Sequence, residues 1–242
     1  MLKTFFIGLF ILFLLEPLLS DTWIPKGPTC YKSVSSFYFA EIFPAHSRIN
    51  NEKPMCFFYK TNILNNDEMI YDPEKLYSLI WKGELVNDGA PNKAIISPNG
   101  YLVTFDEHGN LGYNHSLVIY NKEGKVVKDF QLTDLIPTQD IELFTSSTSS
   151  IYWKNDSKYF FINPDKENES MQNPSHLYVI LGTQKVIEIK LESGILKYGD
   201  ISMFKYANYL NKTNSFNERA LVIESSLDFS SLTELLDCKL NK

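Results

Sequence analysis

The chain has 242 residues, of which 44% are hydrophobic and 21% are charged. This is the balance of an ordinary globular protein, and it excludes a disordered, collagen-like or coiled-coil chain. The net charge of −6 argues against nucleic acid or an anionic membrane surface as the main partner. Aromatic residues make up 14% of the chain, which favours a packed, β-rich core.

The N-terminus has the pattern of a secretory signal peptide. Lys3 gives a basic start, and the nearly continuous apolar run Thr4–Leu15 follows it. A charged start, a short apolar stretch and a small residue at the cut are typical of such a signal. We therefore predict cleavage between Ser20 and Asp21. The apolar run is shorter than the about 20 residues that span a membrane.

This interpretation defines the domain organisation and the location of the protein. Residues 1–20 are the expected signal peptide, and residues 21–242 are expected to form a single β-rich domain. We expect a secreted or periplasmic protein with no stable membrane span after signal cleavage. The alternative is an N-terminal anchor that is not cleaved.

The three cysteines are compatible with export. An oxidising compartment permits disulfides, and Cys30 and Cys56 are the expected pair because both flank one predicted antiparallel unit. Cys238 would then remain as a thiol near the C-terminus. The alternative is that all three are buried thiols. Their spacing matches no zinc-binding pattern.

Short apolar runs between turn-forming residues predict strands along most of the chain. Single helical turns or short helices are expected at Thr133–Ile136 and Gly199–Leu210, and a C-terminal helix at Phe229–Cys238. The expected strands are Phe37–Phe43, Cys56–Tyr59, Tyr77–Leu85, Lys93–Ile96, Tyr101–Phe105, Ser116–Tyr120, Lys125–Phe130, Ser150–Trp153, Lys158–Ile162, His176–Leu181, Lys185–Leu191, Gly194–Lys197 and Ala220–Glu224.

Two pairs of segments suggest a weak internal repeat. Ile119–Lys128 aligns with Ile189–Lys197 around a glycine, and each predicts a strand, a tight polar turn and a second strand. Ser35–Phe43 likewise aligns with Ser97–Phe105. Units of four short strands repeated at about 40–50 residues are typical of propeller blades. We therefore expect a mainly β fold of antiparallel short-strand hairpins, with a short C-terminal helix. The sheets are expected to form a propeller-like assembly that is either closed or incomplete. A stacked or sandwich-like sheet is the alternative.

The segments Ser97–Asp106 and Ser116–Lys128 together resemble one blade of the WD40-like and TolB-like propellers. They are also similar to uncharacterised secreted bacterial proteins that have degenerate repeats of this kind. The resemblance implies a propeller-type fold and a binding or scaffold role. It implies no catalytic residue, because the matching motifs describe strands and turns.

One polar loop is the best candidate for site chemistry. Two carboxylates and two imidazoles in one glycine-containing loop could hold a divalent cation; the cluster is Asp106, Glu107, His108, Asn110 and His115. Asp106, His108 and His115 are the candidate ligands. The alternative is a solvated hairpin loop. The sequence contains no nucleophile-elbow, zinc-protease, P-loop or dinucleotide motif.

These observations favour an exported, non-catalytic β-propeller-like module that binds a ligand of unknown identity. No cofactor is expected, and a protein or a cell-envelope component is the expected partner, with no nucleic acid. The alternative function is an exported hydrolase or metal-dependent enzyme that uses the Asp106–His115 loop.

Overall fold

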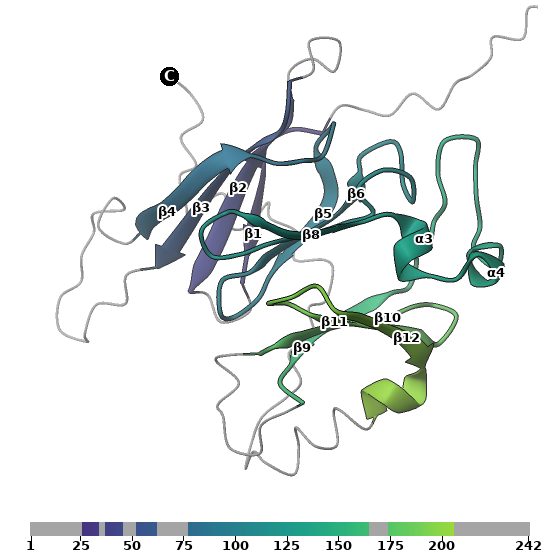
Figure 1. Cartoon of the computed structure of the whole chain (residues 1–242). Coiled ribbons are helices and arrows are strands. Elements are labelled where there is room, and N and C mark those ends of the chain that lie inside the picture. The colour runs from purple at the N-terminus through teal and green to yellow at the C-terminus, as the bar shows by residue number, and fades with distance from the viewer. Residues whose placement is uncertain (1–25, 34–36, 46–51, 62–76, 165–173, 206–242) are drawn as a thin grey trace, which may run out of the picture.

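A computed structural model describes residues 26–33, 37–45, 52–61, 77–164 and 174–205. Within these residues the fold is built from three four-stranded sheets (Figure 1). The first sheet contains β1 Thr29–Lys32, β2 Tyr38–Phe43, β3 Met55–Thr61 and β4 Tyr77–Glu84. The second contains β5 Pro91–Ile96, β6 Leu102–Glu107, β7 Leu117–Tyr120 and β8 Val126–Phe130. The third contains β9 Lys158–Ile162, β10 His176–Ile180, β11 Lys185–Lys190 and β12 Leu196–Asp200.

Each sheet is an antiparallel meander in which every strand pairs with the next strand of the chain. The mainly β prediction and its short-strand hairpins are therefore confirmed. The predicted helical turn is present as α3 Leu132–Leu135, and α4 Thr138–Ile141 adds a second turn. Among the described residues, no helix is both long and apolar enough to cross a membrane.

The second sheet lies between the other two and is covered on both faces. Alternate residues of β7 belong to different cores: Val118 and Tyr120 pack with the first sheet, whereas Leu117 and Ile119 pack with the third. Side chains of a strand alternate between the two faces of its sheet. Because both faces are covered, β6 and β7 are buried along their whole length; β7 is apolar throughout, whereas β6 ends in the buried carboxylates Asp106 and Glu107.

The far face of the third sheet is covered by a short helical segment at residues 201–205. Phe204 lies 4.6 Å from Phe160 and 5.9 Å from Tyr178, measured between ring centroids. This segment falls within the helix predicted at Gly199–Leu210. The helix thus closes a small third core on the outside of the stack.

Equivalent turns in the first two sheets use the same serine contact. The backbone N–H of Tyr38 donates to Ser33 Oγ before β2, and that of Tyr101 donates to Ser97 Oγ before β6. Both serines are buried. In each of these two sheets a buried serine thus holds the backbone just before or at the start of the second strand.

The turns before the fourth strands also match. Gly124 precedes β8 and Gly194 precedes β12, and both have a positive φ. A Cβ added at Gly124 would lie 2.6 Å from Trp81 of the first sheet, and one at Gly194 would lie 2.6 Å from Lys128 of the second. Each glycine therefore lets its turn approach the last strand of the preceding sheet.

The first strands of the three sheets adjoin one another. β1 lies in contact with β5, and the ammonium of Lys26, just before β1, donates to the carbonyls of Pro91 and Asn92 at 2.8 and 2.7 Å. On the other side, Lys93 Nζ of β5 lies 3.9 Å from the centre of the Tyr159 ring on β9. The fourth strands β4, β8 and β12 carry many of the exposed residues.

Two expectations need correction. Ser150–Trp153 is not a strand, because only Ile151 makes an isolated bridge, to Ser146, before the chain turns. The short strand β1 was not expected from the sequence. The signal peptide with its Ser20–Asp21 cleavage site, the strand at Ala220–Glu224 and the C-terminal helix lie outside the described residues.

Candidate functional site

The structure does not bring Asp106, His108 and His115 together as one set of ligands. Asp106 is fully buried at the end of β6, with a left-handed φ of 45°. Its Oδ1 accepts the backbone N–H of Gly112 at 2.8 Å and the indole N–H of Trp153 at 3.0 Å. Its Oδ2 lies 2.7 Å from Lys154 Nζ. Both oxygens of this carboxylate are therefore engaged by protein donors.

His115 instead lies near two other carboxylates. Within the described residues, Asp88, Glu107 and His115 form a group whose ligand atoms lie within 4.8 Å of one another. Asp88 also forms an ion pair with Lys53, and His115 Nδ1 lies 2.8 Å from Asp129 Oδ2. A cation would compete there with the Lys53 ammonium, which weakens this group as a metal site.

His108 is placed by its backbone, whose N–H donates to the carbonyl of Ala90 at 2.8 Å. Neighbouring side chains of this segment thus point in different directions. Asp106 points into the core between the second and third sheets, and Glu107 points to the opposite face of β6. This divergence follows from the alternation of side chains along a strand. The sequence alone could not show which carboxylate joins His115.

Cys30 and Cys56, the expected disulfide pair, are both thiols in the structure. Strand register places Cys30 opposite Glu41, and Cys56 opposite Ile42. Glu41 and Ile42 are neighbours on β2, so they and their cysteine partners point to opposite faces of the sheet. Cys30 Sγ lies 3.9 Å from Glu41 Oε1, whereas Cys56 is fully buried, and burial raises the pKa of its thiol. Cys238 lies outside the described residues.

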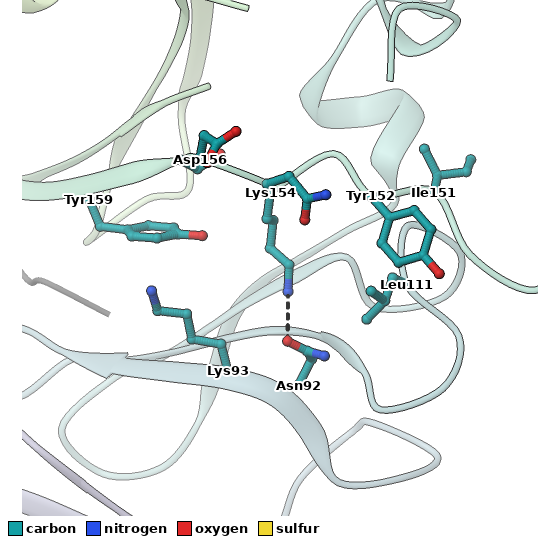
Figure 2. A pocket seen from close by; sticks show the side chains of 10 residues that line it. Asn92, Lys93, Leu111, Ile151, Tyr152, Lys154, Asp156 and Tyr159 are labelled. Carbon is teal, nitrogen blue, oxygen red and sulfur yellow. Dashed lines mark hydrogen bonds between the residues drawn. The ribbon is translucent and has the colours of Figure 1, made fainter. Parts of the chain in front are cut away.

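A pocket of about 270 Å³ lies where β5 meets the segment before β9. Its polar side chains come from both parts of the chain, and Figure 2 shows Lys93, Lys154 and the Tyr159 hydroxyl directed toward one space. The lining residues are Asn92, Lys93, Leu111, Ile151, Tyr152, Lys154, Asn155, Asp156, Ser157 and Tyr159.

The two lysines of the pocket are held differently. Lys154 is only 10% exposed and is paired with Asp106, and its ammonium also donates to Asn92 Oδ1 at 3.4 Å. Lys93 packs on the Tyr159 ring, and no carboxylate of the described residues pairs with it. Burial and the nearby Lys154 charge lower the pKa of Lys93 to about 8.

Lys26 lies beside the pocket and adds a third cation. Its ammonium donates to the Tyr31 hydroxyl at 2.9 Å and to two backbone carbonyls of β5. Burial, and secondly Lys154, lower its pKa to about 8 as well. Asp106 pairs with Lys154, whereas no carboxylate of the described residues forms an ion pair with Lys26 or Lys93.

The sequence analysis did not predict this site. Lys93 begins an apolar strand and Lys154 follows a core tryptophan, and both look like ordinary surface lysines in a sequence with 23 basic residues. The register that brings them together depends on the packing of the second sheet on the third. Comparison with known proteins gave no matching protein family and no matching curated protein.

Proposed function

We propose that the chain is an exported, non-catalytic, propeller-like binding module and that its ligand group enters the pocket at Lys93 and Lys154. The observation that carries the proposal is the pocket itself. Its side chains converge from two sheets, as expected of a preformed ligand site. Its lining holds no histidine or cysteine, and its carboxylate is that of exposed Asp156. Its ammonium and hydroxyl groups suit the binding of an acceptor group of a ligand.

The arrangement of the sheets supports a propeller-like assembly. Three four-stranded meanders stack face to face, with their first strands together and their fourth strands more exposed. Blades of a propeller have this order around a central axis. The resemblance of Ser97–Asp106 and Ser116–Lys128 to a WD40-like or TolB-like blade points the same way. The pocket would then lie beside the axis, between the second and third blades.

We assign the partner to a protein or a cell-envelope component, because the expected signal peptide directs the chain out of the cytoplasm. Photo-crosslinking in the native cells tests this. A benzophenone amino acid replaces exposed Asn155 at the pocket, and in a matched control it replaces Leu143, which is 65% exposed and lies outside the pocket. The proposal predicts one reproducible adduct from position 155 and none from position 143. Equal labelling at the two positions, or no adduct from position 155, contradicts it.

A metal-dependent enzyme remains the second candidate, and Asp88, Glu107 and His115 are the observation that favours it. This alternative predicts that the purified protein binds one equivalent of Zn²⁺ and that His115→Ala abolishes this binding. His108→Ala is the matched control, because His108 is not part of the group. Calorimetric titration with Zn²⁺ separates the two candidates: our proposal predicts that neither variant differs from the wild type.

A further inference from the structure

The pocket concentrates positive charge that the described residues do not balance. Lys26, Lys93 and Lys154 lie close enough that Lys154 depresses the pKa values of the other two. Among the described residues, the carboxylate of Asp106 pairs with Lys154, and neither Lys26 nor Lys93 forms an ion pair. Like charges brought together in a partly desolvated site repel one another. A bound anion would relieve this repulsion.

Neutral donors surround the same space. The Tyr159 hydroxyl makes no hydrogen bond within the described residues, and in Figure 2 it is directed toward the side of the pocket where Lys154 lies, with the Lys93 ammonium over the ring. Ser157 Oγ is a buried atom that has no hydrogen-bond partner there. Such groups are normally satisfied, so two of them beside an ammonium indicate room for an acceptor. Both residues line the pocket.

The opposite wall of the pocket is apolar. Leu111, Ile151 and the Tyr152 ring line it. Asp156 is also a lining residue, but its side chain is exposed, and Figure 2 shows its carboxylate directed away from Lys93. The site therefore combines cationic and hydroxyl donors with an apolar wall. A volume of about 270 Å³ limits the ligand to a small molecule or to one end group of a larger one.

We infer that this pocket binds a small organic anion, whose carboxylate or phosphate group lies against Lys93, Lys154 and the Tyr159 hydroxyl and whose apolar part lies against Leu111 and Ile151. The inference rests on the proposed function, in that it takes this pocket as the ligand site. An ammonium–carboxylate or ammonium–phosphate contact in such a site is a charge-assisted hydrogen bond. Lys93 is the deciding residue, because its charge has no carboxylate partner in the described structure.

Titration of the full mature chain with four related probes tests the inference. Benzoate and phenyl phosphate carry the two anionic groups, benzamide is the neutral counterpart of benzoate, and benzylamine is a cation. We expect one of the two anions to bind, and the tighter one identifies the head group. We expect benzamide and benzylamine to bind at least about tenfold more weakly, because they lack the charge-assisted hydrogen bond.

Three lysine variants test the role of the Lys93 charge in binding. Lys93→Met keeps most of the side-chain volume and should weaken binding of the anion about tenfold. Lys128→Met is the matched variant, since Lys128 also lies over an aromatic ring, that of Phe130, but outside the pocket. It should leave the affinity within about twofold. Lys93→Arg retains the charge and should retain most of the affinity.

Three results would overturn the inference: no binding of either anion at millimolar concentration, equal binding of benzoate and benzamide, or an unchanged affinity in Lys93→Met. These results differ from a failure of the proposed function. Crosslinking at position 155 without binding of the anionic probes would leave the binding module in place and remove the anion. Binding of a probe without any crosslinked partner would support the anion site and contradict the proposed protein or cell-envelope partner.

Discussion

Lys154 and Lys93 line one pocket but have opposite electrostatic surroundings. Lys154 pairs with a carboxylate that also accepts from Trp153 and Gly112, so its charge is part of a closed buried network. Lys93 lies on the Tyr159 ring without a carboxylate partner among the described residues. The difference separates a lysine that holds the second and third sheets together from a lysine that remains available to a ligand.

The largest effect should come from breaking the buried pair. Lys154→Met leaves the Asp106 carboxylate buried without its cation, and such a change costs about 3–5 kcal/mol. We expect the free energy of unfolding, measured by urea denaturation, to fall by this amount. Lys185→Met is the control, because the Lys185–Asp200 pair is exposed to solvent and should contribute little to stability. Equal losses in the two variants would show that the buried pair has no special structural role.

The double variant Asp106→Asn with Lys154→Met sharpens this result. The uncharged amide oxygen can still accept from Trp153 and Gly112, while no isolated charge remains in the core. We expect it to recover a large part of the stability that Lys154→Met loses. If the double variant is as unstable as Lys154→Met alone, the loss of stability comes from packing and not from the unpaired charge.

A smaller loss should follow from removing one donor to Asp106. Trp153→Phe deletes the indole N–H that lies 3.0 Å from Asp106 Oδ1, and a hydrogen bond to a charged group contributes about 1.5–3 kcal/mol. Trp81→Phe is the matched control, since the buried indole nitrogen of Trp81 has no hydrogen-bond partner in the structure. Urea denaturation should show a clearly larger loss for Trp153→Phe than for Trp81→Phe. The reverse order would contradict the role of the indole N–H.

The last substitution should raise the free energy of unfolding, whereas the preceding ones lower it. At pH 7 we expect Lys93→Met to be more stable than the wild type, because a partly buried ammonium is removed. The pKa of Lys93 is about 8 in the folded chain and 10.5 without the fold. As the pH rises from 8 to 10.5, the folded wild type loses this proton more readily than the unfolded chain does, so its stability rises.

The advantage of Lys93→Met should therefore shrink across that pH range. Denaturation of both proteins at pH 7 and pH 10 measures the difference. Because the other titrating groups are common to the two proteins, their contributions cancel. A difference that is constant with pH, or that grows, would show that burial does not act on the Lys93 ammonium as described.

The strand pattern was largely predictable, because most strands are apolar runs bounded by turns. The Ser97–Gly100 and Asn121–Gly124 turns were indicated by their residue types alone, and both are present. β1 was missed because Thr29–Lys32 is short and mixed in polarity. Ser150–Trp153 was wrong because Trp153 reads as a strand residue but turns into the core, where its indole reaches Asp106.

The site was less predictable than the fold. Asp106, Glu107 and His115 were identified as chemically interesting, and Glu107 and His115 lie in one group, whereas Asp106 points away from it. Asp106 interacts with Trp153 and Lys154, and His115 with Asp129, and these pairings come from tertiary packing. A solitary lysine in a sequence gives no sign that its charge will be buried without a partner.

The most direct measurement is the pKa of the Lys93 ammonium with and without an anion, followed by NMR of lysine labelled at Cε. The Lys93→Arg variant assigns the signal. The account predicts a pKa near 8 in the free protein, and a rise when phenyl phosphate or benzoate saturates the pocket, because the bound anion stabilises the charged form. A pKa of Lys93 that stays the same at saturating anion would contradict the central claim that this lysine is kept for an anionic ligand.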